Sequence, residues 1–256
     1  MAELKNIVFE RDQNVATITL NRPPLNVLNI EMMKEINSVL EDLKDDRKLK
    51  VVIFRAEGKA FSAGVDVSDH TEEKAEEMIH VFHQIFFLMT KIKAPTIALV
   101  NGKALGGGCE LATFCDITLA SDESKFGQPE IKVGVFAPIA AVMFPRFMNL
   151  KKAMELNLTG ETMDAHEAKN IGLVNAVFPT DKFDEEVKGY IEKLTMNSSV
   201  VLQLTKQAIY EALGSEYHIG VAKAENIYLN ILMKTHDANE GLKAFLEKRK
   251  PVWRNE

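Results

Sequence analysis

The sequence is poor in the residues that mark secreted and nucleic-acid-binding proteins. Its 256 residues include only two cysteines, Cys109 and Cys115, which lie in one apolar segment and are expected to be small buried side chains. A disulfide framework is therefore not expected, and a reducing compartment is favoured. Charge of one sign is also scarce, because 37 acidic and 31 basic residues are interspersed and leave a net charge of −6. This balance argues against nucleic acid as the primary ligand.

Long hydrophobic runs are missing as well. The longest apolar stretches, 81–89 and 133–148, are interrupted by His83, Pro138 and Pro145 and are shorter than the roughly 20 residues of a membrane-spanning helix. The N-terminal segment mixes both charges and lacks the apolar centre of a signal peptide. We therefore expect a soluble, cytoplasmic protein that does not bind membranes.

Several common catalytic motifs are absent from the sequence. The glycines at 106–108 lack the third glycine of a dinucleotide fingerprint, because Leu111 stands in its place, and no P-loop or Gly-x-Ser-x-Gly elbow occurs. His166 has no second histidine at the spacing of a zinc protease, and His80 with His83 fits a helix face better than a metal site. We expect neither a metal nor a nucleotide cofactor.

What the sequence does contain is a regular alternation of strand-like and helix-like apolar patterns. A hydrophobic content of 46% suits one large domain or one domain with an appendage. The alternation predicts the α/β class with mostly parallel strand pairing. The predicted elements are strands at 7–10, 15–20, 51–54 and 96–100, helices from 29 to the charged turn at 45–47 and at about 73–93, and a loop at 56–66.

The last part of the chain has almost only helical periodicity. Helices are predicted at 183–196, 200–213, 218–233 and 238–248. The change in character sets a boundary near residue 197. Residues 1–196 are therefore the predicted core, and residues 197–256 are a predicted helical appendage.

The most informative segment lies between the strand at 96–100 and a helix-like run. Three consecutive glycines at 106–108 leave peptide N–H groups open to a ligand oxygen, and the following helix adds its positive end. Glu110 and Glu130 supply two carboxylates. Fixed N–H donors and two carboxylates can stabilise an enolate while moving protons beside a carbonyl. Taken alone, the glycines could instead serve close helix packing, and the glutamates could be surface charges.

A series of short segments, in a fixed order, carries a family resemblance. They are Phe-Ser-Ala-Gly-Val-Asp at 61–66, Asn-Gly-Lys-Ala-Leu-Gly-Gly-Gly-Cys-Glu-Leu-Ala at 101–112, Cys-Asp at 115–116, Phe-Gly-Gln-Pro-Glu at 126–130, Leu-Thr-Gly at 158–160, Ala-Lys-Asn-Ile-Gly-Leu-Val at 168–174 and the tail at 245–253. Together they resemble the enoyl-CoA hydratase/isomerase (crotonase) superfamily over nearly the whole chain. The resemblance implies a crotonase-like spiral of ββα units, in which the C-terminal helical region mediates trimerisation.

The resemblance implies that the peptide N–H groups of Val65 and Gly107 form an oxyanion hole for the carbonyl of an acyl-CoA thioester. Main-chain donors are already oriented when charge develops, and loss of one donor typically costs about 3 kcal/mol of barrier. Glu110 and Glu130 match the two catalytic glutamates of the family. Glu110 is assigned to the attacking water and Glu130 to proton exchange at the α-carbon, with a shared role left open.

The resemblance also implies which residues hold CoA, which is part of the substrate and the only coenzyme expected. The loops around it in relatives correspond to Ala63, Gly64, Asp66 and Gly106. Phe245 and Lys248 match tail positions that reach the nucleotide from a neighbouring subunit, although Lys248 could equally be a solvated charge. The family forms trimers that often pair into hexamers, so a homo-oligomer is expected.

The chain departs from the hydratase pattern after the second glutamate. Where many hydratases have a Gly-x-Gly-Gly-Thr-type stretch, this sequence has Phe136, Pro138 and Ile139. These side chains would reshape the pocket near the reacting carbons, and Phe136 and Pro138 are predicted to contact the substrate. The variant resembles the cyclohexa-1,5-diene-1-carbonyl-CoA hydratases, which add water to an alicyclic dienoyl thioester. Alternatively, Pro138 only begins a helix, and Ile139, Val142 and Phe144 pack inward.

We therefore expect a hydratase that acts on an enoyl or dienoyl thioester. Two other functions stay open: double-bond isomerisation through the same enolate, which needs a single carboxylate, and a non-catalytic scaffold that binds CoA or RNA. Retention of both glutamates disfavours the isomerase, and the acidic balance disfavours the RNA-binding scaffold.

Overall fold

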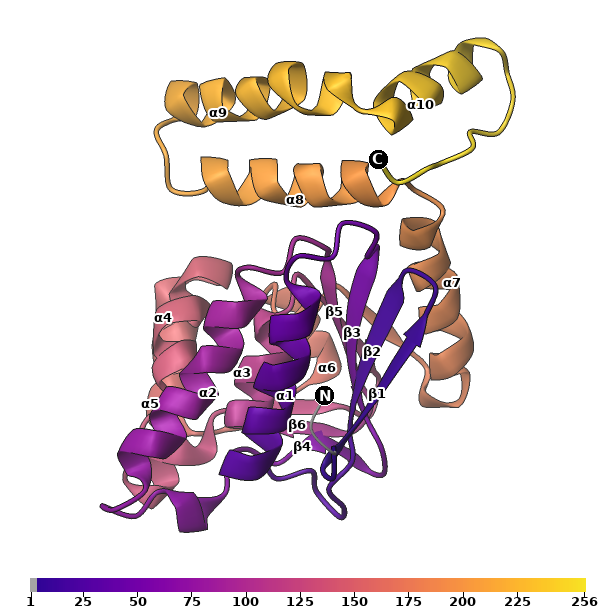
Figure 1. Ribbon diagram of the computed structural model, residues 1–256. Coiled ribbons are helices and arrows are strands. Elements are labelled where there is room, and N and C mark those ends of the chain that lie inside the picture. Colours follow the sequence, from indigo (N-terminus) through magenta and orange to yellow (C-terminus); the bar gives the residue numbers. More distant parts are fainter. Residues whose placement is uncertain (1–3) are drawn as a thin grey trace.

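The computed structural model describes residues 4–256 and shows a strand-and-helix core with a layer of helices above it (Figure 1). Among the described residues, six strands form the main sheet in the order β1-β2-β3-β5-β7-β10. Their bounds are β1 (Ile7–Asp12), β2 (Val15–Leu20), β3 (Val51–Ala56), β5 (Thr96–Val100), β7 (Ile117–Ser121) and β10 (Ala176–Phe178). The β1–β2 hairpin is antiparallel and the other neighbours are parallel. The predictions of α/β class, opening hairpin and mostly parallel pairing are confirmed.

The main sheet is covered on both faces, which explains its unbroken apolar central strands. Val52 and Phe54 of β3 pack into the large core cluster, whereas Val51 and Ile53 pack on the opposite face. Helices α1 (Ile30–Leu43) and α2 (Ala75–Met89) cover the first face, and α7 (Phe183–Thr195) covers the second (Figure 1). Because successive side chains of β3 point to opposite faces of the sheet, this one strand contributes to two separate hydrophobic clusters.

A second, smaller sheet was missed by sequence reasoning. It has the order β4-β6-β8-β9, with bounds β4 (Ala60–Ser62), β6 (Lys103–Leu105), β8 (Lys125–Gly127) and β9 (Thr162–Asp164). The prediction of a loop at 56–66 is wrong at residues 60–62, which form β4. Each of these strands has only three residues, too short for a period-two pattern to be recognised. β4, β6 and β8 run parallel, so their carboxyl ends lie at one edge.

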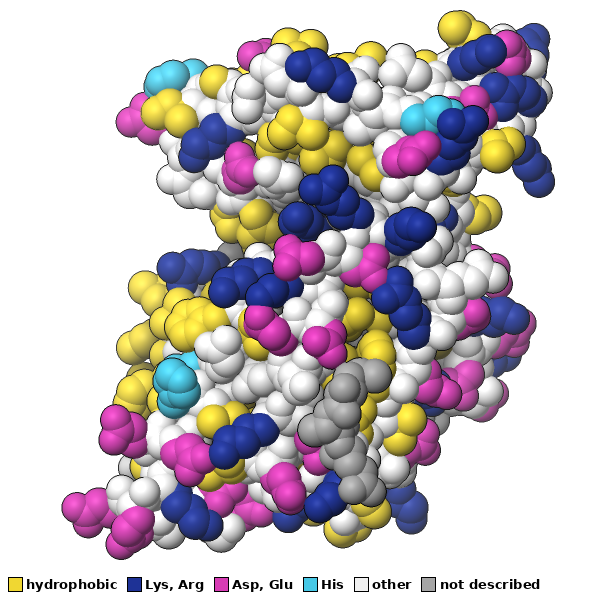
Figure 2. Space-filling model, in the orientation of Figure 1, with side chains coloured by type: hydrophobic (Ala, Val, Ile, Leu, Met, Phe, Trp, Pro, Cys, Tyr) yellow, Lys and Arg dark blue, Asp and Glu magenta, His cyan; other side chains and the backbone are white. Residues whose placement is uncertain are grey.

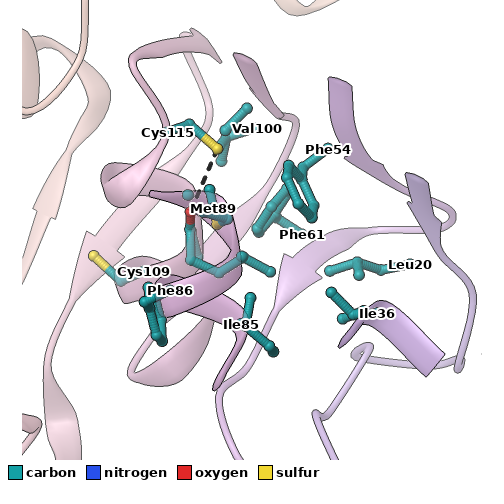
Figure 3. Packing of buried hydrophobic residues seen from close by; sticks show 14 of the residues in the cluster. Leu20, Ile36, Phe54, Phe61, Ile85, Phe86, Met89, Val100, Cys109 and Cys115 are labelled. Atoms are coloured by element: carbon teal, nitrogen blue, oxygen red, sulfur yellow. Dashed lines mark hydrogen bonds between the residues drawn. The ribbon is translucent and has the colours of Figure 1, made fainter. Parts of the chain in front are cut away.

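The remaining helices of the core surround the small sheet. They are α3 (Gly107–Phe114), α4 (Pro138–Phe147), α5 (Leu150–Thr159) and α6 (Ala165–Asn170), with 3₁₀ turns at Val67–Asp69 and Pro129–Val133. Two further 3₁₀ turns lie elsewhere: Thr180–Lys182 precedes α7, and Leu232–Lys234 belongs to the C-terminal helical region. α3 and α2 meet through aromatic rings: Phe86 lies edge-on to Phe114 and to Phe82, with ring centroids 4.9 Å apart in both pairs. Figure 3 shows Phe86 beside Cys109, and Cys115 near Val100. Both cysteines are free and buried, as expected.

The helical C-terminal region lies above the core as α8 (Ser199–Ala212), α9 (Tyr217–Asn230) and α10 (His236–Leu246) (Figure 1). The tail folds back, and Trp253 Nε1 donates to the Met196 carbonyl at 2.7 Å. The division at residue 197 stays a prediction. Within residues 4–256, no helix combines the length and apolar character that a membrane crossing requires.

Candidate active site

Two peptide N–H groups are left open where β4 and β6 end. Leu28 N donates to the Gly64 carbonyl and Asp66 N donates to the Leu28 carbonyl, both at 2.9 Å, so the backbone is pinned on either side of Val65. Gly107 begins α3, where the first N–H groups have no partner within a helix. No atom of residues 4–256 accepts a hydrogen bond from Val65 N or Gly107 N. Both donors are therefore free to bind a ligand oxygen.

The glycines let these backbone segments approach each other. A Cβ on Gly64, whose φ is +108°, would lie 3.2 Å from the Leu105 carbonyl oxygen and 3.5 Å from Gly107 N. A Cβ on Gly107 would lie 2.7 Å from Val65 Cγ2, and one on Gly108 would lie 2.6 Å from Ser62 Cβ. Close packing explains Gly108. At Gly64 and Gly107, the same absence of a side chain brings the two open N–H groups together.

Gly106 has a different role, which concerns the second carboxylate. Its φ is +52°, and a Cβ there would lie 2.3 Å from Glu130 Oε1. Gly106 N also donates to the Gly127 carbonyl at 2.9 Å, which ties the end of β6 to the end of β8. The Glu130 carboxylate therefore rests directly against the glycine backbone.

Glu110 lies in the first turn of α3 and is only 3% exposed, so it is not a surface charge. Its Oε1 accepts a hydrogen bond from Ala140 N at 2.8 Å. Ala140 belongs to the first turn of α4, which begins at Pro138, so a second helix N-terminus faces this carboxyl. Burial raises the pKa of Glu110 to about 8, although the Ala140 hydrogen bond and the nearby helix start oppose the shift.

Glu130 lies in the 3₁₀ turn Pro129–Val133 that follows β8. It is half-buried, and its Oε2 has no hydrogen-bond partner in the part of the chain that the structure describes. Burial raises the pKa of Glu130, while its own backbone N–H and the charge of His70 act in the opposite direction. This carboxyl is therefore not a freely solvated loop charge.

Both glutamates line one cavity of about 850 Å³, together with eighteen other residues of which many were predicted from the sequence. The predicted residues in its lining are Ala63, Gly64, Val65, Gly106, Glu110, Glu130, Phe136 and Pro138. The carboxyl ends of β4, β6 and β8 thus converge on one hollow, the usual ligand-binding place for parallel strands.

Four predicted residues are not part of this lining. One is Gly107, which follows the lining residue Gly106 directly in the chain. Asp66 lines a neighbouring polar hollow of about 430 Å³. Its carboxylate accepts from Ser68 N and Ser68 Oγ and lies 3.5 Å from Arg22, and these contacts, led by the Ser68 hydroxyl, lower the pKa of Asp66. Phe245, 82% exposed, lies at the end of α10, and Lys248 follows it on the surface. A contact of these residues with CoA stays a prediction.

Sequence reasoning missed the part of the cavity lining that α2 supplies. Met78, Ile79 and Phe82 of α2 line the cavity. Their spacing matched the apolar face of an ordinary amphipathic helix, so the sequence gave no sign that one side of this helix faces a cavity. Val133 ends the 3₁₀ turn that carries Glu130, and Val135 lies in the irregular segment before α4; neither place has a periodic pattern that sequence reasoning could use.

Residues 133–138 also line the cavity, whereas Ile139, predicted to reshape it, is not part of the lining. Phe136 is 67% exposed, Pro138 begins α4, and Ile139 packs partly against the core. The alternative prediction of inward packing holds for Phe144 but is wrong for Val142, which is 54% exposed. The segment therefore both starts a helix and walls the cavity.

The site can polarise a carbonyl and move protons beside it. Two open N–H groups provide fixed partial charge, and two carboxyls whose pKa values are raised by burial can accept and donate protons. As for metals, no group of three His, Cys, Asp or Glu side chains among residues 4–256 has the geometry of a metal site. His80 is exposed and His83 is half-buried on α2.

Comparison with known proteins agrees with this geometry. Residues 10–256 match the family model described as enoyl-CoA hydratase/isomerase. A probable enoyl-CoA hydratase echA8 of Mycobacterium bovis is 39% identical over 250 residues, covering 96% of this chain and 97% of the relative. A short-chain-enoyl-CoA hydratase of Clostridium acetobutylicum is 34% identical, covering 97% of each chain.

Solved structures give the same result for the fold. The crystal structure of an enoyl-CoA hydratase of Mycobacterium smegmatis superposes with a TM-score of 0.92 at 30% identity, covering 97% of this chain and 99% of that one. The human enoyl-CoA hydratase domain-containing protein 3 also superposes with a TM-score of 0.92, at 33% identity, and covers 97% of this chain and 100% of that one. The prediction of a crotonase-like fold is confirmed.

Proposed function

Because this chain belongs to the enoyl-CoA hydratase/isomerase family, we propose that it adds water to the double bond of an α,β-unsaturated acyl-CoA thioester. The observation that carries the proposal is the joint placement of Glu110 and Glu130 in one cavity beside the open N–H groups of Val65 and Gly107. Hydration needs one group that accepts a proton from water and one that delivers a proton to carbon. Two carboxyls meet this need, whereas isomerisation can proceed with one.

The reaction follows from these positions. The thioester oxygen accepts hydrogen bonds from Val65 N–H and Gly107 N–H, which stabilise the enolate formed when water attacks the β-carbon. The ionised carboxyl of the pair accepts the proton of the water, and the protonated carboxyl delivers a proton to the α-carbon. The two carboxyls titrate as a pair, and the pair must hold one proton at the start.

This requirement predicts the pH dependence. The pKa of Glu110 is raised to about 8, so the last proton of the pair is lost as the pH rises through that value. We expect kcat to fall above about pH 8 and also to fall at acidic pH, where both carboxyls are protonated. A rate that is flat between pH 6 and 10 would contradict the shared-proton mechanism; those limits are roughly two units either side of the expected midpoint.

For the substrate, we infer an alicyclic dienoyl thioester such as cyclohexa-1,5-diene-1-carbonyl-CoA. Support comes from the wall segment, where Val135, Phe136 and Pro138 face the cavity. Met78 and Phe82 of α2 supply apolar surface to the same hollow. These apolar side chains offer a surface on which an alicyclic ring can pack.

Glu110→Gln and Glu130→Gln test the reaction. Each change should reduce hydration by roughly 10²-fold or more, because one general acid or base is removed while the shape is kept. The assay follows loss of the conjugated thioester absorbance, with crotonyl-CoA and cyclohexa-1,5-diene-1-carbonyl-CoA compared under the same conditions. Full activity in either variant would defeat the hydratase proposal. A wide preference for crotonyl-CoA would defeat only the alicyclic substrate.

Isotope labelling distinguishes the alternatives. Oxygen from labelled water must appear in the product of a hydratase and is absent from the product of an isomerase. A chain that binds no acyl-CoA in calorimetry would instead be a scaffold. These outcomes separate the three functions without relying on rate alone.

We further propose a homo-oligomer, either a trimer or a pair of trimers, in which Phe245 and Lys248 reach the nucleotide of a neighbouring subunit. Phe245 and Leu246 are 82% and 81% exposed at the end of α10, which is unusual for two adjacent large apolar side chains. Mass measurement in solution tests the assembly, and a monomer with full CoA affinity would exclude this role.

A further inference from the structure

The ring of Phe82 lies directly against Gly107, the first residue of α3. A Cβ on Gly107 would lie 3.0 Å from Phe82 Cζ and 3.4 Å from Phe82 Cε2. The same Cβ would lie 2.7 Å from Val65 Cγ2. Carbon atoms in comfortable contact are about 3.5–4.0 Å apart, so neither neighbour leaves room at this point. Gly107 is therefore held against two side chains, one from the loop after β4 and one from α2.

Phe82 is itself fixed in place. It belongs to α2 and lines the cavity, yet it is only 2% exposed, so most of the ring is buried. Its ring stands edge-on to Phe86, with the planes at 87°, and Phe86 in turn stands edge-on to Phe114. Edge-on pairs are favoured by the charge distribution of aromatic rings. The three rings therefore form one packed series from the cavity into the core.

This series holds α3 at both of its ends. Gly107 begins the helix and Phe114 ends it. α2 contacts the first through Phe82 and the second through Phe86, and residues four apart lie on one face of a helix. α3 has only eight residues, and a helix this short takes its stability from packing rather than from its own hydrogen bonds. The position of the Gly107 N–H therefore depends on the Phe82 ring.

We propose that Phe82 is a positioning residue for the oxyanion donors: its ring sets the place of the Gly107 N–H and thereby its spacing from the Val65 N–H. This role rests on the proposed function, in which both N–H groups bind the thioester oxygen. Such donors stabilise the enolate only while they point at that oxygen, and a displacement of about 1 Å can cost roughly 10²-fold in rate. Phe82 acts through the backbone that it supports.

Three variants separate this role from ordinary core packing. Phe82→Leu removes the far atoms of the ring, including the Cζ that meets Gly107. Phe82→Met is the conservative variant, because its unbranched side chain reaches further than leucine and fills irregular gaps, and it also serves if the leucine variant does not fold. Phe54→Leu is the matched control, since Phe54 is fully buried in the same hydrophobic cluster but is not part of the cavity lining.

The carbonyl stretching frequency of a bound thioester reports directly on the two donors. Butyryl-CoA and cyclohexanecarbonyl-CoA are the probes, because neither has a double bond that could be hydrated. Hydrogen bonds to the thioester oxygen weaken the C=O bond, so binding to the wild type should lower the frequency. Phe82→Leu should lower it less, Phe82→Met should recover part of the shift, and Phe54→Leu should match the wild type. An equal shift in Phe82→Leu and the wild type overturns the proposal.

Kinetics provide the second measurement. Phe82→Leu should reduce kcat by roughly 10-fold or more with little change in KM, because an oxyanion donor interacts most strongly in the transition state. Phe54→Leu should lower the melting temperature without this loss of kcat. Equal kcat values in the two leucine variants would show a merely structural role and overturn the proposal. If the carbonyl shift depends on Phe82 but no enoyl-CoA is hydrated, the proposed function fails and the positioning role stands.

Discussion

The edge of the small sheet and the C-terminal helical layer are held in place by opposite means. At the edge, backbone lies against backbone, and a Cβ at Gly106, Gly107 or Gly108 would lie within 2.7 Å of a neighbouring atom. The layer instead rests on long polar side chains that reach down to the core. Lys206 Nζ and Tyr210 Oη both donate to the Asp116 carboxylate at 2.7 Å.

The packing of the two regions differs accordingly. Under α8 lies a hollow of about 470 Å³, lined largely by apolar residues of both layers. Figure 2 shows hydrophobic side chains on the surface where the upper helices meet the core. The site region is therefore sensitive to a single added methyl group, whereas the layer depends on a few hydrogen bonds. Substitutions in the site region should therefore change the catalytic rate, and substitutions in the helical layer should change the free energy of unfolding.

Gly106→Ala should have the largest effect of the changes proposed for the site region. The new Cβ would meet the Glu130 carboxyl, and a φ of +52° is strained for alanine. We expect kcat to fall roughly 10²-fold or more, because the clash displaces a carboxyl that the proposed reaction uses. Gly58→Ala is the matched control, since Gly58 has a φ of +86° but nothing within 4 Å of the added Cβ. Equal activity of the two alanine variants would refute the clash.

Lys206→Met should destabilise the contact between the C-terminal helical layer and the core. Lys206 and Asp116 are only 12% and 16% exposed, so removal of the lysine leaves a largely buried carboxylate with a lost partner. We expect a loss of about 2–3 kcal/mol in the free energy of unfolding, somewhat below the range for fully buried pairs. Urea titration measures the loss, and kcat should change little.

A surface pair provides the control for that change. Lys34 and Glu77 lie 2.6 Å apart but are 56% and 54% exposed, so Lys34→Met should cost less than about 1 kcal/mol. If Lys206→Met and Lys34→Met had the same free energy of unfolding, burial would not make the Lys206–Asp116 pair more stabilising than the surface pair. If Lys206→Met abolished activity, the layer and the site would be coupled.

The same contrast explains what the sequence could predict. The long strands and helices were found because β3 and α1 carry continuous apolar signals, and Glu110 and Glu130 were found because they lie in recognisable motifs. β4 was missed because three residues carry no period, and the cavity face of α2 was missed because Phe82 has the spacing of a core residue. The Lys206–Asp116 ion pair joins residues that are 90 positions apart in the sequence, and no local sequence pattern predicts a contact over that separation.

Glu110→Gln tests how the site region affects stability, because an ionised Glu110 is a buried charge that destabilises the folded protein. The pKa of Glu110 is raised from 4.5 to about 8, so ionisation costs the folded state more than the unfolded chain. The contribution of the neutral carboxyl is complete below about pH 4.5 and is lost as the pH rises toward 8. Glutamine keeps the hydrogen bond from Ala140 N and never ionises. The variant should therefore melt near the wild type at acidic pH and above it at pH 9, by at least roughly 2–4 °C, the shift for each 1 kcal/mol in a chain of this size. If the difference in melting temperature between the variant and the wild type did not change with pH, ionisation of Glu110 would not destabilise the folded protein, and this prediction would be wrong.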